Sequence, residues 1–135
     1  MVRFPRLRRR ARRLELGALE LDVMSLLWTE PALDARTVLE RLQGRRITLS
    51  TVQVTLERLH RKSLVSREKV GRAYRYTPKV TREGLIGLLI EDVAERVADG
   101  ALEPVISGFV DLLGEYSPRL LDELETSAKR RREKP

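Results

Sequence analysis

The sequence predicts a mainly α-helical fold with one small β-hairpin, and three observations support this prediction. Apolar residues recur at three- and four-residue spacing along most of the chain, which indicates amphipathic helices. One stretch, 64–77, is instead alternating and rich in β-forming residues around a central glycine, as a hairpin is. A length of 135 residues with 41% apolar side chains is enough for a compact domain, or for a small domain with an appendage.

The first helix is predicted over residues 15–28, in a central position. Its apolar residues form two stripes about a third of a turn apart. They are Leu16, Leu19, Val23, Leu26 and Leu27 in one stripe and Leu21, Met24 and Trp28 in the other. Because a helix that is apolar on two sides is covered on two sides, we expect it to touch the next helices and the C-terminal ones.

Two short helices and the hairpin follow. Asp34 is a good N-cap for a helix that ends before Gly44. The next helix is predicted to begin at Ser50, because Ser50 and Gln53 have the spacing of a capping box. Strands at 64–69 and 73–77 are joined by a turn around Gly71. This order is typical of a winged helix-turn-helix, which we predict over residues 14–79.

Residues 80–128 are predicted to form a C-terminal helical dimerisation domain. Pro104 and Pro118 suit the first turns of helices, and Gly100 ends the helix before them. The apolar faces exceed what one small chain can cover, so we expect a homodimer. The alternative is that these helices fold back on the winged helix of the same chain. The predicted interface consists of Ile86, Leu89, Ile90, Val93, Val97, Val105, Ile106, Phe109 and Leu113.

The charge is distributed in blocks. The formal net charge is +7, but residues 36–82 carry thirteen bases and three acids, whereas residues 83–128 carry two bases and eleven acids. This contrast favours a module that binds a polyanion joined to an acidic module that faces elsewhere. Residues 1–13, with seven arginines, are predicted to be a disordered arm that adds DNA affinity, and 129–135 a basic tail. A solubilising tail or a misassigned start is the alternative for the arm.

The third helix carries the predicted base-reading residues near its N-terminus. With its apolar stripe of Val52, Leu56 and Leu59 turned inward, polar residues face outward. The amide of Gln53 can pair with adenine and the methyls of Val54 can meet thymine, which favours an A·T-containing site. The hydroxyls that can contact bases or phosphates belong to Ser50, Thr51 and Thr55.

Cations around this helix and on the hairpin are predicted to bind phosphates and so to position the protein. They are Arg45, Arg46, Arg58, Arg61, Arg67, Lys69, Arg72 and Arg75. An ordinary solvated surface is the alternative for each position. Glu57 lies on the outward side as well, where a carboxylate must avoid phosphates or accept a hydrogen bond from cytosine.

The composition excludes several kinds of chemistry. A chain with no cysteine has no disulfide, iron–sulfur cluster or thiolate zinc site, and the single histidine, His60, has no second His or Cys with which to bind a metal. Adjacent acids such as Glu91 and Asp92 diverge on a helix and do not form a catalytic dyad. We therefore predict no enzyme, no metal and no cofactor. The longest apolar run, 85–90, is too short to span a membrane, and a cytoplasmic protein is expected.

Three segments resemble the penicillinase repressor family (BlaI/MecI). Residues 19–28, LELDVMSLLW, are similar to its opening helix, residues 49–59, LSTVQVTLERL, to its recognition helix, and residues 62–65 with 71–78 to its wing. The resemblance runs from about Leu16 to Leu124. It implies a homodimeric transcriptional repressor that binds a palindromic operator in double-stranded DNA. It also implies control of β-lactam resistance or stress genes, and a regulatory protease that cleaves the dimerisation region.

The chain departs from this family in three ways. The arginine-rich arm and the basic tail lie outside the family pattern, and the C-terminal cysteines of copper-responsive relatives are missing. Residues 99–103 do not match a known cleavage sequence. Two other functions are compatible with the sequence. One is non-specific or architectural nucleic-acid binding, which a large affinity ratio between one operator and bulk DNA would exclude. The other is a protein adaptor that uses the acidic helices.

Overall fold

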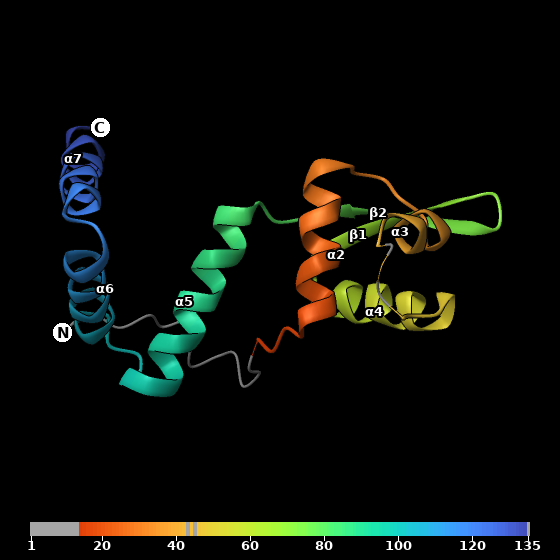
Figure 1. Cartoon of the computed structure of the whole chain (residues 1–135), viewed down its shortest axis with the longest axis horizontal. Helices are drawn as coiled ribbons and strands as arrows, with labels where there is room; N and C mark the ends of the chain where they lie inside the picture. The colour runs from red at the N-terminus through yellow and green to blue at the C-terminus, as the bar shows by residue number, and fades with distance from the viewer. Residues whose placement is uncertain (1–13, 43, 45, 135) are drawn as a thin grey trace. The chain divides into compact units, whose positions relative to one another are not determined.

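The computed structural model describes residues 14–42, 44 and 46–134 (Figure 1). Its elements are α2 (Ala18–Thr29), α3 (Ala35–Arg41), α4 (Leu49–Arg61), β1 (Val65–Val70), β2 (Ala73–Pro78), α5 (Arg82–Ala98), α6 (Glu103–Tyr116) and α7 (Pro118–Glu133). The predicted fold class, three helices with a hairpin and then further helices, is confirmed. The chain divides within α5, between Leu89 and Ile90, into two compact units.

The core of the first unit lies where α2 meets α4 and the hairpin. Val23, Met24 and Leu27 of α2 are fully buried. Val52, Leu56 and Leu59, the predicted inner stripe of α4, are fully buried as well. Leu64, Val65 and Tyr76, in and next to the hairpin, complete the core. From the second predicted stripe, Met24 is buried and Trp28 packs against this core together with Leu88 and Leu89 of α5, whereas Leu21 is exposed. The two-sided burial expected for α2 is thus found only in part.

Side-chain caps fix the starts of α3 and α4. The Asp34 carboxylate accepts a hydrogen bond of 2.8 Å from the backbone N–H of Thr37, as predicted. The cap predicted at Ser50 is wrong, because α4 begins at Leu49 and Thr48 is its N-cap. The Thr48 hydroxyl accepts from the backbone N–H of Thr51 at 3.2 Å, so it satisfies a donor that the helix itself leaves free.

The hairpin is held to the helices by a short third pairing. β1 and β2 are antiparallel, and Gly71 at the turn has a φ of +66°, a conformation that favours glycine. Leu33, just before α3, pairs with Tyr76 through two backbone hydrogen bonds of 3.2 and 2.8 Å. This bridge anchors the base of the hairpin, while the turn between β1 and β2 extends beyond the helices (Figure 1).

The start of α5 is attached to α2. The indole N–H of Trp28 donates to the carbonyl of Val80 at 2.9 Å, and the Arg82 guanidinium lies 4.8 Å from the centre of the Trp28 ring. One turn later Leu85 is buried in the core. The first unit therefore extends beyond the predicted end at residue 79 and includes the first half of α5.

The second unit contains the end of α5 with α6 and α7. Gly100, with a φ of +81°, follows the end of α5, and the backbone N–H of Gly100 donates to the carbonyl of Ala94. None of the residues of α6 and α7, all of which the structure describes, is buried. The predicted basic tail is not a separate segment up to residue 133, because α7 continues to Glu133.

The Asp34 cap gives the first unit a measurable dependence on pH. Hydrogen bonds from the backbone N–H and the hydroxyl of Thr37 hold the pKa of the Asp34 carboxyl below its ordinary value of 3.8. Because the pKa is lowered in the folded state, this stabilisation is complete above the unfolded-state pKa and is lost as the pH falls through the lower folded-state value.

Asp34→Ala should therefore lower the free energy of unfolding by about 1 kcal/mol at neutral pH, with a smaller difference from the wild type under acid conditions. Urea unfolding at a series of pH values measures both. Asp34→Asn is the matched control, because Asn caps equally well but does not titrate. An Asn variant as unstable as the Ala variant at neutral pH would contradict this account.

Candidate nucleic-acid interface

One side of α4 is exposed and polar along its first two turns. Burial of Val52, Leu56 and Leu59 fixes the rotation of the helix about its axis. Ser50, Thr51, Gln53 and Val54 are consequently exposed, as predicted, and 45% of Val54 is accessible although the residue is apolar. Arg58 and Arg61 continue the exposed side toward the C-terminal end. Contact of these side chains with DNA stays a prediction.

Thr55 does not belong to this exposed surface. Only 5% of the residue is accessible, and its hydroxyl donates to the carbonyl of Thr51 at 2.8 Å. Its predicted role as a DNA contact is therefore corrected. A threonine on the flank of a helix can satisfy its hydroxyl on the carbonyl four residues earlier, which permits burial against the core.

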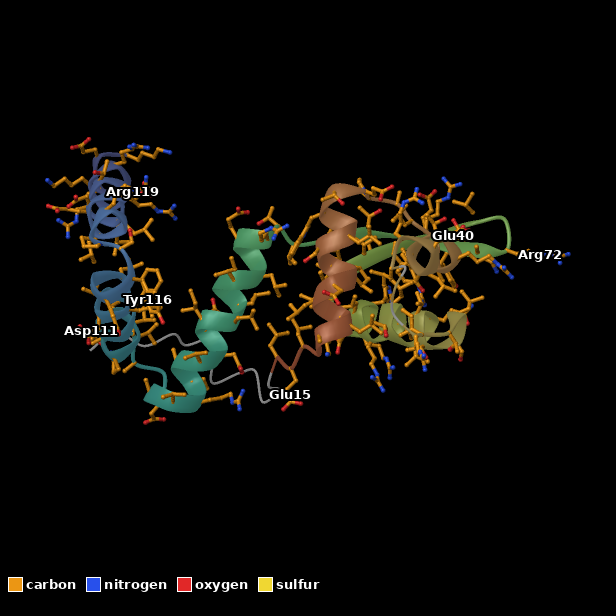
Figure 2. The ribbon with its side chains drawn as sticks, viewed as in Figure 1. Glu15, Glu40, Arg72, Asp111, Tyr116 and Arg119 are labelled. Atoms are coloured by element: carbon orange, nitrogen blue, oxygen red, sulfur yellow. The ribbon has the colours of Figure 1, made fainter. Side chains whose placement is uncertain are left out.

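The hairpin adds exposed cations. Lys69, Arg72 and Arg75 are exposed, and Figure 2 shows Arg72 at the tip, pointing away from the helices. Arg46, shortly before α4, is exposed too. The predicted contact Arg45 lies outside the described residues, as does the basic arm 1–13.

Arg67 differs from the other hairpin cations because its guanidinium is occupied within the protein. It forms an ion pair with Glu57 of α4 and lies 4.3 Å from the centre of the Tyr74 ring. Hydrogen bonding to Tyr76 and Glu57 raises the pKa of Arg67 above its ordinary value. Only 23% of its side chain is accessible. The structure therefore places Arg67 between the hairpin and α4, and it does not support the predicted phosphate contact.

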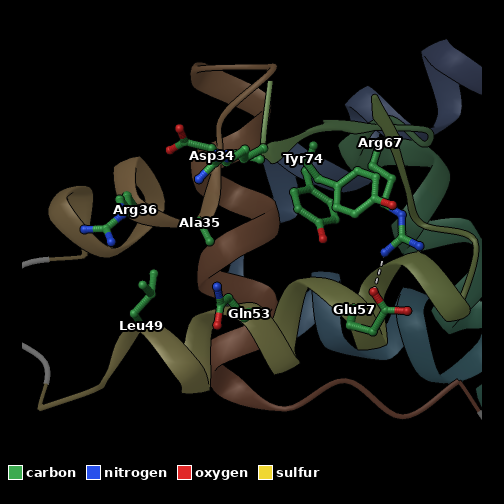
Figure 3. A pocket seen from close by; sticks show the side chains of 11 residues that line it. Asp34, Ala35, Arg36, Leu49, Gln53, Glu57, Arg67 and Tyr74 are labelled. Carbon is green, nitrogen blue, oxygen red and sulfur yellow. Dashed lines mark hydrogen bonds and ion pairs between the residues drawn. The ribbon is translucent and has the colours of Figure 1, made fainter. Parts of the chain in front are cut away.

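A cavity of about 460 Å³ is lined by residues of α3, α4 and the hairpin. Figure 3 shows its lining, with Gln53 and Glu57 on α4, Tyr74 on the hairpin and Arg36 on α3. Arg36 is exposed at the start of α3 and was not among the predicted cations. The signal that could have identified it is its position directly after the Asp34-capped helix start, beside the predicted recognition helix.

The described residues also bear on metal binding and on membrane insertion. No group of three or more His, Asp or Glu side chains among them is placed to hold a metal ion. In the same part of the chain, no helix combines the length and the apolar character needed to cross a bilayer. His60 is half-buried on α4. What the geometry does provide is a polar helix face bordered by a cationic hairpin.

A helix of this kind next to a hairpin wing defines the class of winged-helix DNA-binding proteins. The family model described as penicillinase repressor matches residues 16–130, and the chain belongs to this family. It is thus a winged-helix DNA-binding transcriptional regulator of the BlaI type, in a family of non-enzymatic repressors.

Relatives of the chain are also described as BlaI regulators. It is 38% identical over 103 residues to the transcriptional regulator BlaI of Mycobacterium tuberculosis strain CDC 1551 / Oshkosh, and the match covers 73% of this chain and 74% of the relative. The regulator of the same name from strain H37Rv gives the same values. A solution structure of the DNA-binding domain of the repressor BlaI is 27% identical, with a TM-score of 0.48, and covers 52% of this chain and 87% of that one.

Arg72→Ala should weaken binding to all duplexes to a similar degree, because Arg72 is an exposed cation at the wing tip and we expect phosphate to be its partner. Loss of one phosphate contact should flatten the slope of log K against log salt concentration by about 0.9. Titrations of two unrelated duplexes over a range of salt concentrations measure this slope.

Arg119→Ala is a suitable control for Arg72→Ala, because it removes the same charge from an exposed position on α7, in the other unit. It should leave the slope unchanged. A normal slope for Arg72→Ala combined with a changed preference between the duplexes would show that the wing reads bases.

Proposed function

We propose that the protein is a sequence-specific repressor that binds a palindromic operator as a homodimer. The observation that carries this proposal is the exposed face of α4, where Gln53 and Val54 can distinguish bases, next to a hairpin whose cations can fix the register. Its chemistry favours an A·T-containing half-site. The duplex DNA that it binds lies in the cytoplasm of a bacterial cell, where we expect the protein to act.

The assignment of contacts follows from exposure. Base reading is assigned to Ser50, Thr51, Gln53 and Val54. Phosphate binding is assigned to Arg46, Arg58, Arg61, Lys69, Arg72 and Arg75, all of which are exposed. Arg36 is added to the phosphate-binding group because it lines the cavity between α3, α4 and the hairpin, as Arg72 does. Thr55 and Arg67 are left out for the reasons given above.

Exposed apolar side chains on α5 and α6 support the homodimer. Val97 is 82% accessible and Phe109 is 49% accessible, which is unfavourable for large apolar groups that remain in water. Ile86, Ile90, Val93 and Ile106 are exposed as well. Val105 and Leu113 are half-buried, and Leu89 packs on the core of the first unit, so it is not assigned to the interface.

The regulated genes that we propose are those of β-lactam resistance or stress response, because the family is described by its penicillinase repressor. A regulatory protease is the partner that the family resemblance implies. Gly100 and Ala101, within the segment where cleavage would be expected, are buried in this structure. We therefore expect cleavage to require local opening of this segment first.

Selection of bound fragments from the host genome by the full-length protein tests the proposal directly. We expect a two-fold symmetric sequence with half-sites about 10 bp apart or a multiple of it, as a dimer requires. The selected duplex should bind about 10³-fold or more tightly than random DNA. Fragments that share no sequence would instead favour a non-specific architectural protein.

Phe109→Asp should dissociate the dimer, because a carboxylate buried without a partner costs several kcal/mol. Sedimentation and operator titration should show a monomer that binds weakly. Ser107→Asp is the control, since it adds the same charge at an exposed polar position of α6. A Phe109→Asp variant that stays dimeric and binds the operator tightly would place the interface elsewhere.

A further inference from the structure

Glu57 occupies an unfavourable position for a DNA-binding protein. It lies on α4 in the turn between Val54 and Arg58, both of which are exposed, and 42% of its side chain is accessible. A carboxylate on this side repels phosphates at short range. Its place in the structure therefore needs an explanation beyond ordinary surface exposure.

The explanation lies in the partner of Glu57. Arg67 extends from β1 across the cavity and forms an ion pair with the Glu57 carboxylate (Figure 3). The same guanidinium lies over the Tyr74 ring of β2, and the Tyr74 and Tyr76 rings are 6.4 Å apart. Arg67 thus connects α4 to both strands of the hairpin at once.

The ion pair has two consequences. It occupies a cation that would otherwise be available to phosphates of any sequence, and it adds a side-chain contact between the hairpin and α4. Sequence-independent attraction is supplied by phosphate contacts, whereas discrimination is supplied by base contacts. A pair that removes one phosphate contact and holds the wing beside the base-reading helix improves discrimination on both counts.

We propose that the Glu57–Arg67 ion pair is a specificity determinant, in which Glu57 holds Arg67 away from phosphates and connects the wing to the recognition helix. The proposal rests on the sequence-specific DNA binding proposed above. Both members are positioning residues, since neither is assigned a contact with DNA.

Glu57→Gln in the full-length protein is the first test. Gln has the same shape but no charge, so the ion pair is replaced by a weaker neutral hydrogen bond and Arg67 can exchange it for a phosphate contact. On a random-sequence duplex the slope of log K against log salt concentration should steepen by about 0.9, as for one additional phosphate contact. The genome-selected duplex should gain less affinity, because the wing is no longer held in its place beside α4, so the ratio between the two duplexes falls.

Two further variants separate this mechanism from a simple loss of negative charge. Glu40→Gln removes an exposed carboxylate from α3 and should change neither the slope nor the ratio appreciably. Glu57→Gln combined with Arg67→Gln has the net charge of the wild type, and its slope should return to the wild-type value. Thermal unfolding of each variant verifies that the fold is retained.

The outcomes are distinct. If Glu57→Gln behaves like Glu40→Gln, or if Arg67→Gln alone flattens the slope by about 0.9, Arg67 is an ordinary surface or phosphate-binding cation and the proposal is overturned. A wild-type protein that binds every duplex equally would overturn the proposed function itself. A wild-type protein that discriminates, with unaffected Glu57 variants, overturns the specificity role alone.

Discussion

The exposed surface of α4 depends on the apolar contact between α2 and α4. Val23, Met24 and Leu27 meet Val52, Leu56 and Leu59 in a core where all six side chains are fully buried. Burial of each contributes about 1.5–3 kcal/mol relative to exposure. Rotation of α4 about its axis would expose its stripe to water, so the same contact that stabilises the domain also determines which residues face outward. The exposed side of α4 is the side that does not pack against the core.

Polar interactions at the edge of this core set the direction of each element. One Glu20 carboxylate oxygen accepts from the backbone N–H of Gly17 and closes the start of α2, while the other pairs with Lys62 at 2.6 Å, where α4 ends. Each charge lies at the helix terminus that it stabilises electrostatically. At the other end of α2, the Trp28 bond to the Val80 carbonyl holds the start of α5. α2 is therefore attached at both ends as well as along its sides.

The sequence was sufficient to predict the features that depend on periodicity and local chemistry. Apolar spacing gave the helices, alternation around Gly71 gave the hairpin, and Asp34 gave a cap, because each is decided within a few residues. Other features could not be predicted from residue type. Thr48 and Ser50 are both plausible caps by type, and only the backbone path selects Thr48. Thr55 is turned toward the core by its place on α4, and its hydrogen bond to the Thr51 carbonyl permits this burial.

The Glu57–Arg67 pair shows most clearly why the surface could not be predicted residue by residue. From the sequence, Glu57 was an unfavourable charge and Arg67 one cation among eight, since nothing in their spacing connects a helix position to a strand position. The register of the hairpin and its anchor at Leu33 bring the two together. A count of arginines therefore overestimates the cations that this domain can offer to phosphate, because one of them pairs with a carboxylate on the same side. The effective charge of the interface is set by the fold as much as by the composition.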